Sequence, residues 1–538
     1  MSLDYKKRKV EKFIFFLLFF TGSYFLHQQV ENSNTSSRYF LISAVVDFGT
    51  LSIDVYQDYT IDKSFSNGHY YSNKAIGAPL LGVPVYWILR NLPYMQDRPP
   101  LASIERYLIR VVTTTLPFAL LGVVMFRMAC LWGAGPAIAL WMVIAYAFGS
   151  LAFIHATIFS GHQIAACFSF FSFSILYQLY RQVEEKGERP HSQQIIQVFL
   201  SGLFAGIAAL SDYSAILIAA ALSVYVLSLS LPVRLKILFF LGGGLCVVIL
   251  ALYNLNCFGS PWSLSYEHLA YKKFQEGSAK GLLGVSMPDP TALLSLLFSP
   301  SRGLFFIMPI FLFSLIGFVA LWKRYEFRRE TLLILVLVAG YLFINSGFYG
   351  WHGGWTFGPR YLVPIFPFLA FPIAFATWEP FWFYILFGIS AFQVSLAVVG
   401  LSHIPHEIQN PIIEFILPCL GYGYMALNAG RLIGLQNIWS AIPFFIIVAV
   451  SVKLLSYRIS MEKQDRGISS IWKTFMGFSI FFIILMLAIV RTKPPELVHE
   501  NRSLALYNAA KATHSTQFRQ MSIYEARLAE KIKTRGKK

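Results

Sequence analysis

The chain has 538 residues, of which 56% are hydrophobic and only 13% charged, and its mean hydropathy is +0.57. A soluble core of this size cannot bury so much apolar surface, so the composition excludes a soluble globular protein and indicates a membrane protein. The formal net charge is +17. Its lysines and arginines stand in short clusters between apolar runs, which is typical of membrane topology and not of nucleic-acid binding.

The amino end predicts an uncleaved first membrane span, because the basic residues Lys6–Lys9 lead into an apolar run without a small-residue cleavage site. With the amino end inside, this span delivers residues 28–75 to the outside as a large first loop. Phe40 to Val45 have helical spacing beside Asp47 and predict a short interfacial helix. Residues 76–92 are short and contain two prolines, which favours a re-entrant or interfacial helix over a full span.

Apolar runs along the rest of the chain predict further spans, and the basic residues between them fall inside. These runs are near residues 107–126, 133–154, 162–180, 195–211, 214–230, 236–255, 303–322, 331–347, 361–376, 380–402, 436–456 and 471–490. With the first span the count is about thirteen. Residues 411–427 hold a glutamate and a proline and are not expected to cross fully. We therefore expect an all-α polytopic membrane domain over residues 1–490, with outer loops at 256–302 and 348–360, and a polar tail over 491–538.

Ionisable residues close to the membrane interior are energetically unfavourable and are usually retained for function. The membrane face that they share therefore indicates where a functional site lies. Under this topology they share the outer face, opposite Arg181, Lys323 and Arg328. They are Asp47, Asp54, Asp62, Lys74, His162, Asp212, Arg302, His352 and Arg360. A single loop aspartate is more often a solvated turn residue than a catalyst, and it is their convergence that favours a site. The inner loops show no glycine-rich phosphate cradle, which argues against chemistry driven by cytosolic nucleotide.

The segment Tyr349–Tyr361, YGWHGGWTFGPRY, combines features of a saccharide-phosphate site. Indole faces such as those of Trp351 and Trp355 stack on sugar C–H surfaces, and glycines permit close backbone approach. The planar fork of Arg360 suits a phosphate group. The alternative is an aromatic belt at the water interface with an arginine anchored to lipid headgroups, and these residues alone leave both interpretations open.

Five stretches of the chain carry a family resemblance. They read SRYFLISAVVDFGTLSID from Ser37, DKSFSNGHYYSNKAIGAPLLGVP from Asp62, YNLNCFGSPW from Tyr253, FSPSRGLFF from Phe298 and WHGGWTFGPRYLVPIFPFL from Trp351. Together they resemble bacterial membrane glycosyltransferases of the protein-mannosyltransferase and aminoarabinose-transferase type, whose fold is called GT-C. The resemblance implies a polyprenyl-phosphate sugar as donor, a glycan, lipid or protein hydroxyl as acceptor, inversion at the sugar, and an active site on the outer face of a bacterial inner or plasma membrane.

The resemblance also implies a residue that faces the donor phosphate. Lys74, in YSNKAIG, matches the lysine of the family pattern Y-x-x-K-P-P, although Ala75 and Ile76 replace the two prolines. We expect Arg302 and Arg360 to support Lys74 at the phosphate. His162, Asp212, Trp351, His352 and Trp355 are the expected sugar- and acceptor-binding residues.

The family's catalytic aspartate is absent from its usual place. It stands three residues before an Arg-Tyr pair, and here Thr35 occupies that position before Arg38-Tyr39. We expect Asp54 and Asp62 jointly to supply the general base, which is worth about 10²- to 10⁴-fold in rate. Asp47, Glu31 and Asp212 are next in line.

No cofactor is expected, and no cluster of histidine, cysteine or acidic residues has metal-ligand spacing. Two other classes of function stay open on the sequence: a transporter or flippase of lipid-linked saccharide, and a non-catalytic membrane scaffold. Against transport, the chain shows no inverted halves and no paired broken helices.

Overall fold

The computed structural model describes residues 3–451 except 28–32, 97, 187–191, 378, 407, 422–424, 436 and 449, together with isolated positions between 503 and 530. The expected span at 471–490, Glu31 and nearly all of the tail lie outside the described residues. Within them six helices are long and apolar enough to cross a membrane. The expected class, an all-α membrane protein, is confirmed at this level, while the expected count of about thirteen spans is not.

The helices that satisfy both length and hydropathy coincide with predicted spans. They occupy Ser103–Leu131, Gly161–Val183, Gln194–Ser211, Val233–Phe258, Tyr325–Gly347 and Pro380–Val399. The first is built from α5 (Ser103–Arg110), a π-helical turn η2 (Val111–Thr115) and α6 (Leu116–Leu131); the others contain α9 (Gly161–Lys186), α10 (Ser192–Ser211), α12 (Val233–Phe258), α17 (Arg328–Gly347) and α19 (Pro380–Val399). The remaining long or apolar helices among the described residues are α1 (Leu3–Tyr24), α7 (Pro136–Gly149), α11 (Ile216–Ser228), α16 (Leu312–Lys323), α18 (Phe366–Ala370) and the helix Trp439–Val448.

Short elements connect the bundle. They are α2 (Ser33–Asp47), α3 (Gly77–Arg90), α4 (Pro93–Gln96), α8 (Ala152–Ala156), α13 (Lys272–Ser278), α14 (Pro290–Phe298), α15 (Leu304–Ile307), α20 (Leu417–Gly421) and α21 (Ala429–Leu432). The strands described form two antiparallel pairs, β1 (Phe25–His27) with β4 (Leu427–Asn428) and β2 (Lys63–Ser66) with β3 (His69–Ser72).

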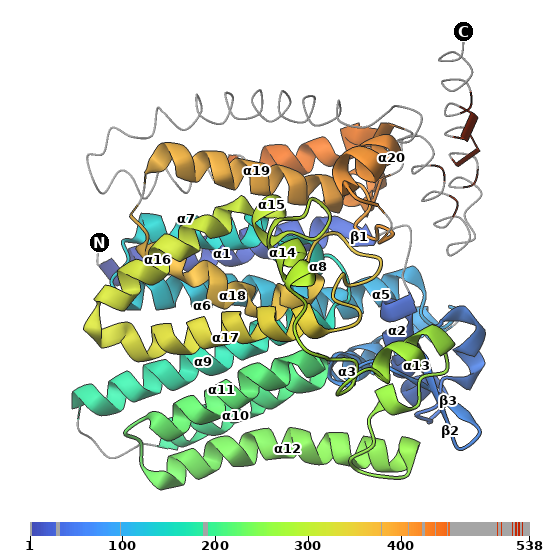
Figure 1. Ribbon diagram of the computed structural model, residues 1–538, viewed down its shortest axis with the longest axis horizontal. Coiled ribbons are helices and arrows are strands. Elements are labelled where there is room, and N and C mark those ends of the chain that lie inside the picture. The colour runs from blue at the N-terminus through green and yellow to red at the C-terminus, as the bar shows by residue number, and fades with distance from the viewer. Residues whose placement is uncertain are drawn as a thin grey trace.

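The long helices lie side by side, with their axes roughly parallel (Figure 1). Glycines allow the closest approach, between α10 and α12. A Cβ on Gly202 would lie 1.8 Å from the carbonyl oxygen of Phe239, and one on Gly242 would lie 2.2 Å from that of Phe199. Small residues at helix crossings are typical of packing in a membrane, where van der Waals contact replaces the hydrophobic effect between helices.

The short helices expected in the first loop are present as α2 and α3, which pack on each other. The last residue of α2, Asp47, accepts hydrogen bonds from Tyr86 Oη at 2.8 Å and from Arg90 Nε at 3.2 Å. Trp87 and Ile88 on α3 remain 59% and 57% exposed. The buried side of α3 consists of small residues and Tyr86, and the exposed side carries large apolar residues, which fits a helix at the membrane interface.

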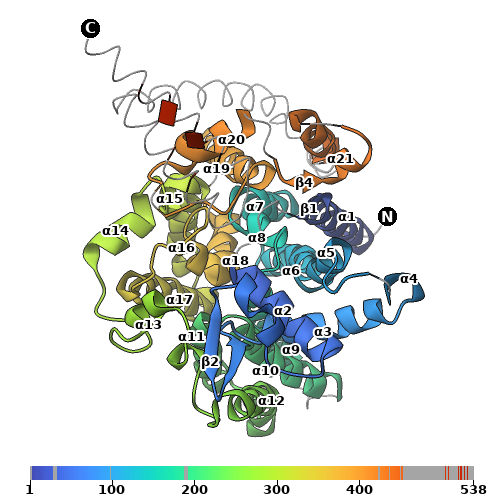
Figure 2. The same cartoon turned by 90° about the vertical axis from the view of Figure 1, so that its right-hand side faces the viewer.

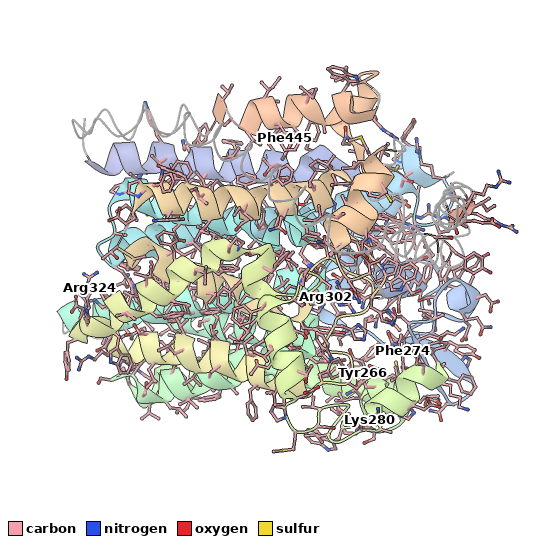
Figure 3. The ribbon with its side chains drawn as sticks, turned by 45° about the horizontal axis from the view of Figure 1, so that its top comes forward. Tyr266, Phe274, Lys280, Arg302, Arg324 and Phe445 are labelled. Carbon is pink, nitrogen blue, oxygen red and sulfur yellow. The ribbon has the colours of Figure 1, made fainter. Side chains whose placement is uncertain are left out.

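The bundle has two distinct ends. One, here called the loop end, carries α2, α3, the β2–β3 hairpin and α13, and Figure 2 faces it. The other, here called the basic end, carries the start of α1 and the turn from α16 to α17. Figure 3 shows Arg324 at the basic end, while Tyr266 and Arg302 lie toward the loop end. The elements of the first loop and α13 therefore lie at the same end of the bundle.

Candidate functional site

A tight hairpin brings the first charged pair together. Asn67 and Gly68 both have positive φ, at 52° and 83°, as a two-residue hairpin turn requires. The strands pair Lys63 with Ser72, so the residues just outside them return to the same place. Lys74 Nζ lies 2.6 Å from Asp62 Oδ1, and both side chains are about nine-tenths buried, with exposures of 11% and 10%.

This ion pair is fixed to α2. Ser37 Oγ donates to the backbone oxygen of Asp62 at 2.6 Å and shares a hydrogen bond with Ser72 Oγ at 2.8 Å. Burial lowers the pKa of the Lys74 ammonium, and the Asp62 carboxylate opposes that shift. An anion that approached Lys74 would favour its charged form further.

Two arginines add positive charge beside this pair. Arg38, on α2, is 5% exposed and donates from Nη1 to the backbone oxygen and to the side-chain oxygen of Asn34. Arg360, which opens the 3₁₀ helix η7 (Arg360–Ile365), donates from Nη2 to Tyr361 Oη at 3.2 Å. In each arginine the Nε atom is buried, and no group among the described residues accepts a hydrogen bond from it. Burial lowers the pKa of Arg38, while Tyr266, Asp212 and Asp62 act in the opposite direction.

A histidine and a carboxylate form the second charged pair. His162 lies at the start of α9, and its Nδ1 is hydrogen-bonded to Asp212 Oδ2. Asp212 follows α10 and also accepts from Ser214 N at 3.1 Å. Burial raises the pKa of Asp212, but His162 and Ser214 outweigh that effect and lower it. A Cβ at Gly161 would lie 2.2 Å from the backbone oxygen of the residue before Asp212, so only glycine permits this approach.

A pocket opens against these groups. Its lining comes from α2, from the α8–α9 connection and from the loops before η7 and after α19, and consists of Asn34, Thr35, Ile154, His155, Ile158, Phe159, Ser160, Gly161, His162, Trp355, Thr356, Arg360, Ser402 and His403. Thr35, where the resemblance implies an aspartate, is therefore at the pocket, and no carboxylate is among these lining residues. Burial and nearby Arg360 lower the pKa of His403 to about 4. Burial likewise lowers the pKa of His155 well below its ordinary value.

Arg302 holds the loop beside the pocket. It is 2% exposed, and it donates from Nε to the carbonyl oxygen of His352 at 2.5 Å and from Nη2 to that of Gly354 at 3.0 Å. These hydrogen bonds tie Arg302 to the loop, and its expected role at the donor phosphate stays a prediction. His352 accepts from Gly354 N at 3.0 Å and stacks on His406, and burial together with His406 lowers its pKa to about 4. Trp355 lines the pocket, whereas the Trp351 ring contacts His352.

Asp54 lies apart from these residues. It accepts from Tyr70 N at 2.6 Å and pairs with His69 Nδ1 at 2.7 Å, where the side chains of the histidine and the aspartate are 58% and 35% exposed. Burial opposes its ionisation, but the hydrogen bonds outweigh burial and lower its pKa. Of the two aspartates expected jointly, the structure brings Asp62 to Lys74, and it places Asp54 at the start of the 3₁₀ helix η1 (Asp54–Tyr59), where it contacts β3.

The buried cluster is defined here as Arg38, Lys74 and Arg360 together with Asp62 and the His162–Asp212 pair. Electrostatic interactions link its members: Arg38 and Arg360 act on Lys74, and Asp62 and Asp212 act on Arg38. Three cations thus oppose two carboxylates. Among the described residues no group of three or more histidine, cysteine and acidic side chains is placed to hold a metal ion.

Sequence reasoning missed Arg38, His155 and His403 as site residues. Arg38 had a signal, because it is a charged residue two positions before the apolar run of the predicted interfacial helix. The two histidines had none, since each lies in a short apolar connection and only the fold brings them to one pocket. Tyr266 was missed as well; it interacts with Arg38 and Arg360.

Comparisons with protein-family models, with curated proteins and with solved structures found no match. The function is therefore argued from the geometry of the cluster.

Proposed function

We propose that the chain is a membrane glycosyltransferase that moves a sugar from a polyprenyl-phosphate donor to an acceptor hydroxyl at the loop end, with inversion. The observation that carries the proposal is the excess of buried cations in the cluster: Arg38, Lys74 and Arg360 oppose only Asp62 and Asp212. An unbalanced buried charge is costly unless an anion joins it. A phosphate group bound there would remove the imbalance.

The hydrogen-bonding capacity of the cluster suits a phosphate. Arg38 and Arg360 each hold a buried Nε–H that no described group accepts. Guanidinium N–H groups bind phosphate oxygens in a planar, often bidentate, arrangement, and an ammonium adds a compact charge. Phosphate oxygens are therefore the acceptors that would complete both arginines beside Lys74.

The surroundings suit a lipid-borne phosphate. Lys74 lies three residues before α3, whose outer side leaves Leu80 and Ile88 42% and 57% exposed. A prenyl chain that entered from the bilayer along this apolar side would deliver its phosphate at Lys74. Trp355, on the pocket wall, offers an indole to a sugar.

The reaction is a single displacement. The acceptor oxygen forms a bond to the anomeric carbon while the bond from that carbon to the phosphate oxygen breaks, and the electron pair of that bond leaves with the phosphate. Lys74 and the two arginines stabilise the developing charge, an effect worth about 2.7–4 kcal/mol per donor in enzymes that use it. The acceptor proton must go to a base. Of Asp54 and Asp62, only Asp62 lies in the cluster.

The test is transfer by the purified full-length chain. Polyprenyl-phosphate donors that carry radiolabelled hexose, N-acetylhexosamine or pentose would be supplied with membrane lipids and n-octyl glucoside as acceptors. We expect the label to enter an acceptor with release of polyprenyl phosphate. A flippase would move labelled donor across a liposome membrane without forming a glycosidic bond, and a scaffold would do neither. Absence of transfer from every donor would overturn the proposal.

A further inference from the structure

We propose that His162, oriented by Asp212, is the base that takes the proton from the acceptor hydroxyl. This inference rests on the proposed glycosyl transfer and assigns its missing catalytic group. It replaces the carboxylate that the family resemblance implies at the position occupied by Thr35.

The geometry of the pair is that of a general base. His162 lines the pocket, and its Nδ1 is bonded to the Asp212 carboxylate. Because a carboxylate accepts, Nδ1 carries the hydrogen, and Nε2 is left with its lone pair. A carboxylate that fixes the tautomer of an imidazole and stabilises the imidazolium is a recurring device for proton abstraction.

The other lining histidines are less suited to the task. His155 Nδ1 is bonded to Ser160 Oγ at 2.7 Å, and its pKa lies well below the ordinary value because of burial. The pKa of His403 is lowered to about 4 by burial and by Arg360. Burial disfavours the protonated forms of all three histidines, and His162 is the one whose ring is hydrogen-bonded to a carboxylate that opposes this effect.

Asp62 is less suited to act as the base, because it is already paired with Lys74. Its Oδ1 lies 2.6 Å from Lys74 Nζ, and it is not among the residues that line the pocket. Protonation of Asp62 would leave the buried ammonium without its partner, which is costly. We infer that Asp62 positions Lys74 for the phosphate, and that the proton goes elsewhere.

Charge balance supports His162. With a neutral imidazole the cluster carries one net positive charge, which matches the single negative charge of a sugar phosphodiester. As the carbon–oxygen bond breaks, the donor becomes a phosphomonoester with up to two negative charges. The proton transferred from the acceptor oxygen to His162 Nε2 raises the charge of the cluster by one in the same step. The site and its ligand therefore stay matched before and after transfer.

The protonation of His162 responds to several groups around it. Those that face it from neighbouring elements are Asp212, Arg38, Arg360, His155, Tyr361 and His403. Burial disfavours the imidazolium most, Asp212 favours it, and the two arginines oppose it until a phosphate binds them. The pH dependence should therefore be measured with saturating donor.

The test compares His162→Gln and Asp212→Asn with the unaltered chain, using the donor and n-octyl glucoside pair that supports transfer. We expect His162→Gln to lower kcat about 10²- to 10⁴-fold with little change in the KM for the donor. Asp212→Asn should lower kcat less and move the acid limb of the rate profile to lower pH, because the carboxylate that favours the imidazolium is gone. A purely structural role would lower yield or thermal stability and leave that limb in place.

His69 provides the matched control, because it also pairs with a carboxylate but lies exposed on the hairpin. His69→Gln should leave kcat and the acid limb unchanged. Normal kcat in His162→Gln, or an unmoved limb in Asp212→Asn, would overturn the inference while the proposed function stands. If His162→Gln fails to fold, the limb in Asp212→Asn decides alone. If the unaltered chain transfers no sugar, the proposed function fails and the inference fails with it.

Discussion

The two ends of the bundle hold charged networks of opposite character. At the basic end, Arg329 donates from Nε and Nη2 to the Glu330 carboxylate at 3.0 and 2.8 Å, and Tyr225 Oη donates to the same group at 2.8 Å. At the loop end, Arg38 and Arg360 keep buried Nε–H groups for which the described residues provide no acceptor. The first network is balanced within the protein, and the second needs an anion from outside.

The difference separates packing from function. A balanced network adds cohesion between helices and is complete without a ligand. An unbalanced one lowers stability, because buried donors and charges without partners are costly, and a protein tolerates that cost where a ligand completes the network. Substitutions at the loop end should therefore change transfer most, and substitutions at the basic end should change stability alone.

The largest effect is expected at Lys74. Lys74→Ala removes the compact charge beside the donor phosphate and should lower kcat/KM for transfer about 10²- to 10³-fold, whereas Lys74→Arg should retain part because the charge remains. Steady-state transfer assays would measure both. Lys63→Ala is the matched control: this lysine, on the same hairpin, donates to the backbone oxygen of Gln57. Equal rates in Lys74→Ala and Lys63→Ala would remove Lys74 from the site.

The next effect distinguishes the two aspartates. Asp62→Asn leaves the buried Lys74 ammonium without its counter-charge and should lower the free energy of unfolding by about 3 kcal/mol, with a weaker interaction with the donor phosphate. Asp54→Asn, at a side chain that is 35% exposed, should stay near the roughly 0.5 kcal/mol typical of surface changes. Denaturation in one detergent and transfer assays would compare them. If Asp54→Asn lost turnover and Asp62→Asn did not, Asp54 would be the general base, as the sequence allowed.

A smaller effect is expected at the basic end. Glu330→Gln leaves the Arg329 guanidinium without its carboxylate and should lower the free energy of unfolding by about 2 kcal/mol, since the glutamate is 1% exposed. Its kcat should match that of the unaltered chain, because the network is at the opposite end of the bundle from the pocket. If Glu330→Gln lowered kcat but left the free energy of unfolding unchanged, the network at the basic end would not be purely structural, and the contrast between the two ends would be wrong.

Much of the architecture could be predicted from the sequence because its signals are local. The apolar run beside Asp47 is α2, the proline-containing run after Lys74 is α3, and hydropathy located the long spans. Charge clusters between spans then indicated which polar residues share an end. These patterns depend on residues near one another in the chain, and the bilayer restricts the structures they can form.

The pairing within the site could not be predicted in the same way. Asp54 and Asp62 look alike in the sequence, and the register of one hairpin decides that Asp62 meets Lys74. The hydrogen bond between His162 and Asp212 joins residues 50 positions apart. The hydrogen bonds from Arg302 to the carbonyl oxygens of His352 and Gly354 join residues about 50 positions apart as well. Contacts between distant segments decide each of these outcomes, and periodicity and charge patterns do not encode them.

The smallest expected effect is on stability in acid, and it tests whether the pocket's histidines are held neutral. The pKa of His403 is about 4 in the folded chain, compared with about 6.5 in an unfolded one. Between these values the unfolded chain binds more protons, so this contribution to stability is complete above pH 6.5 and is lost as pH falls toward 4. We expect the Tm to fall between pH 7 and pH 5, with His403 responsible for up to about 2 kcal/mol. His403→Gln should show a smaller fall than the unaltered chain, and His69→Gln, which alters an exposed histidine, should show the same fall. The fall in Tm is measured within each variant between two pH values. A hydrogen bond that is lost in His403→Gln lowers the Tm at both pH values and therefore does not change this fall. An equal fall in all three would mean that His403 titrates normally, and the pocket would then be more open to water than its burial indicates.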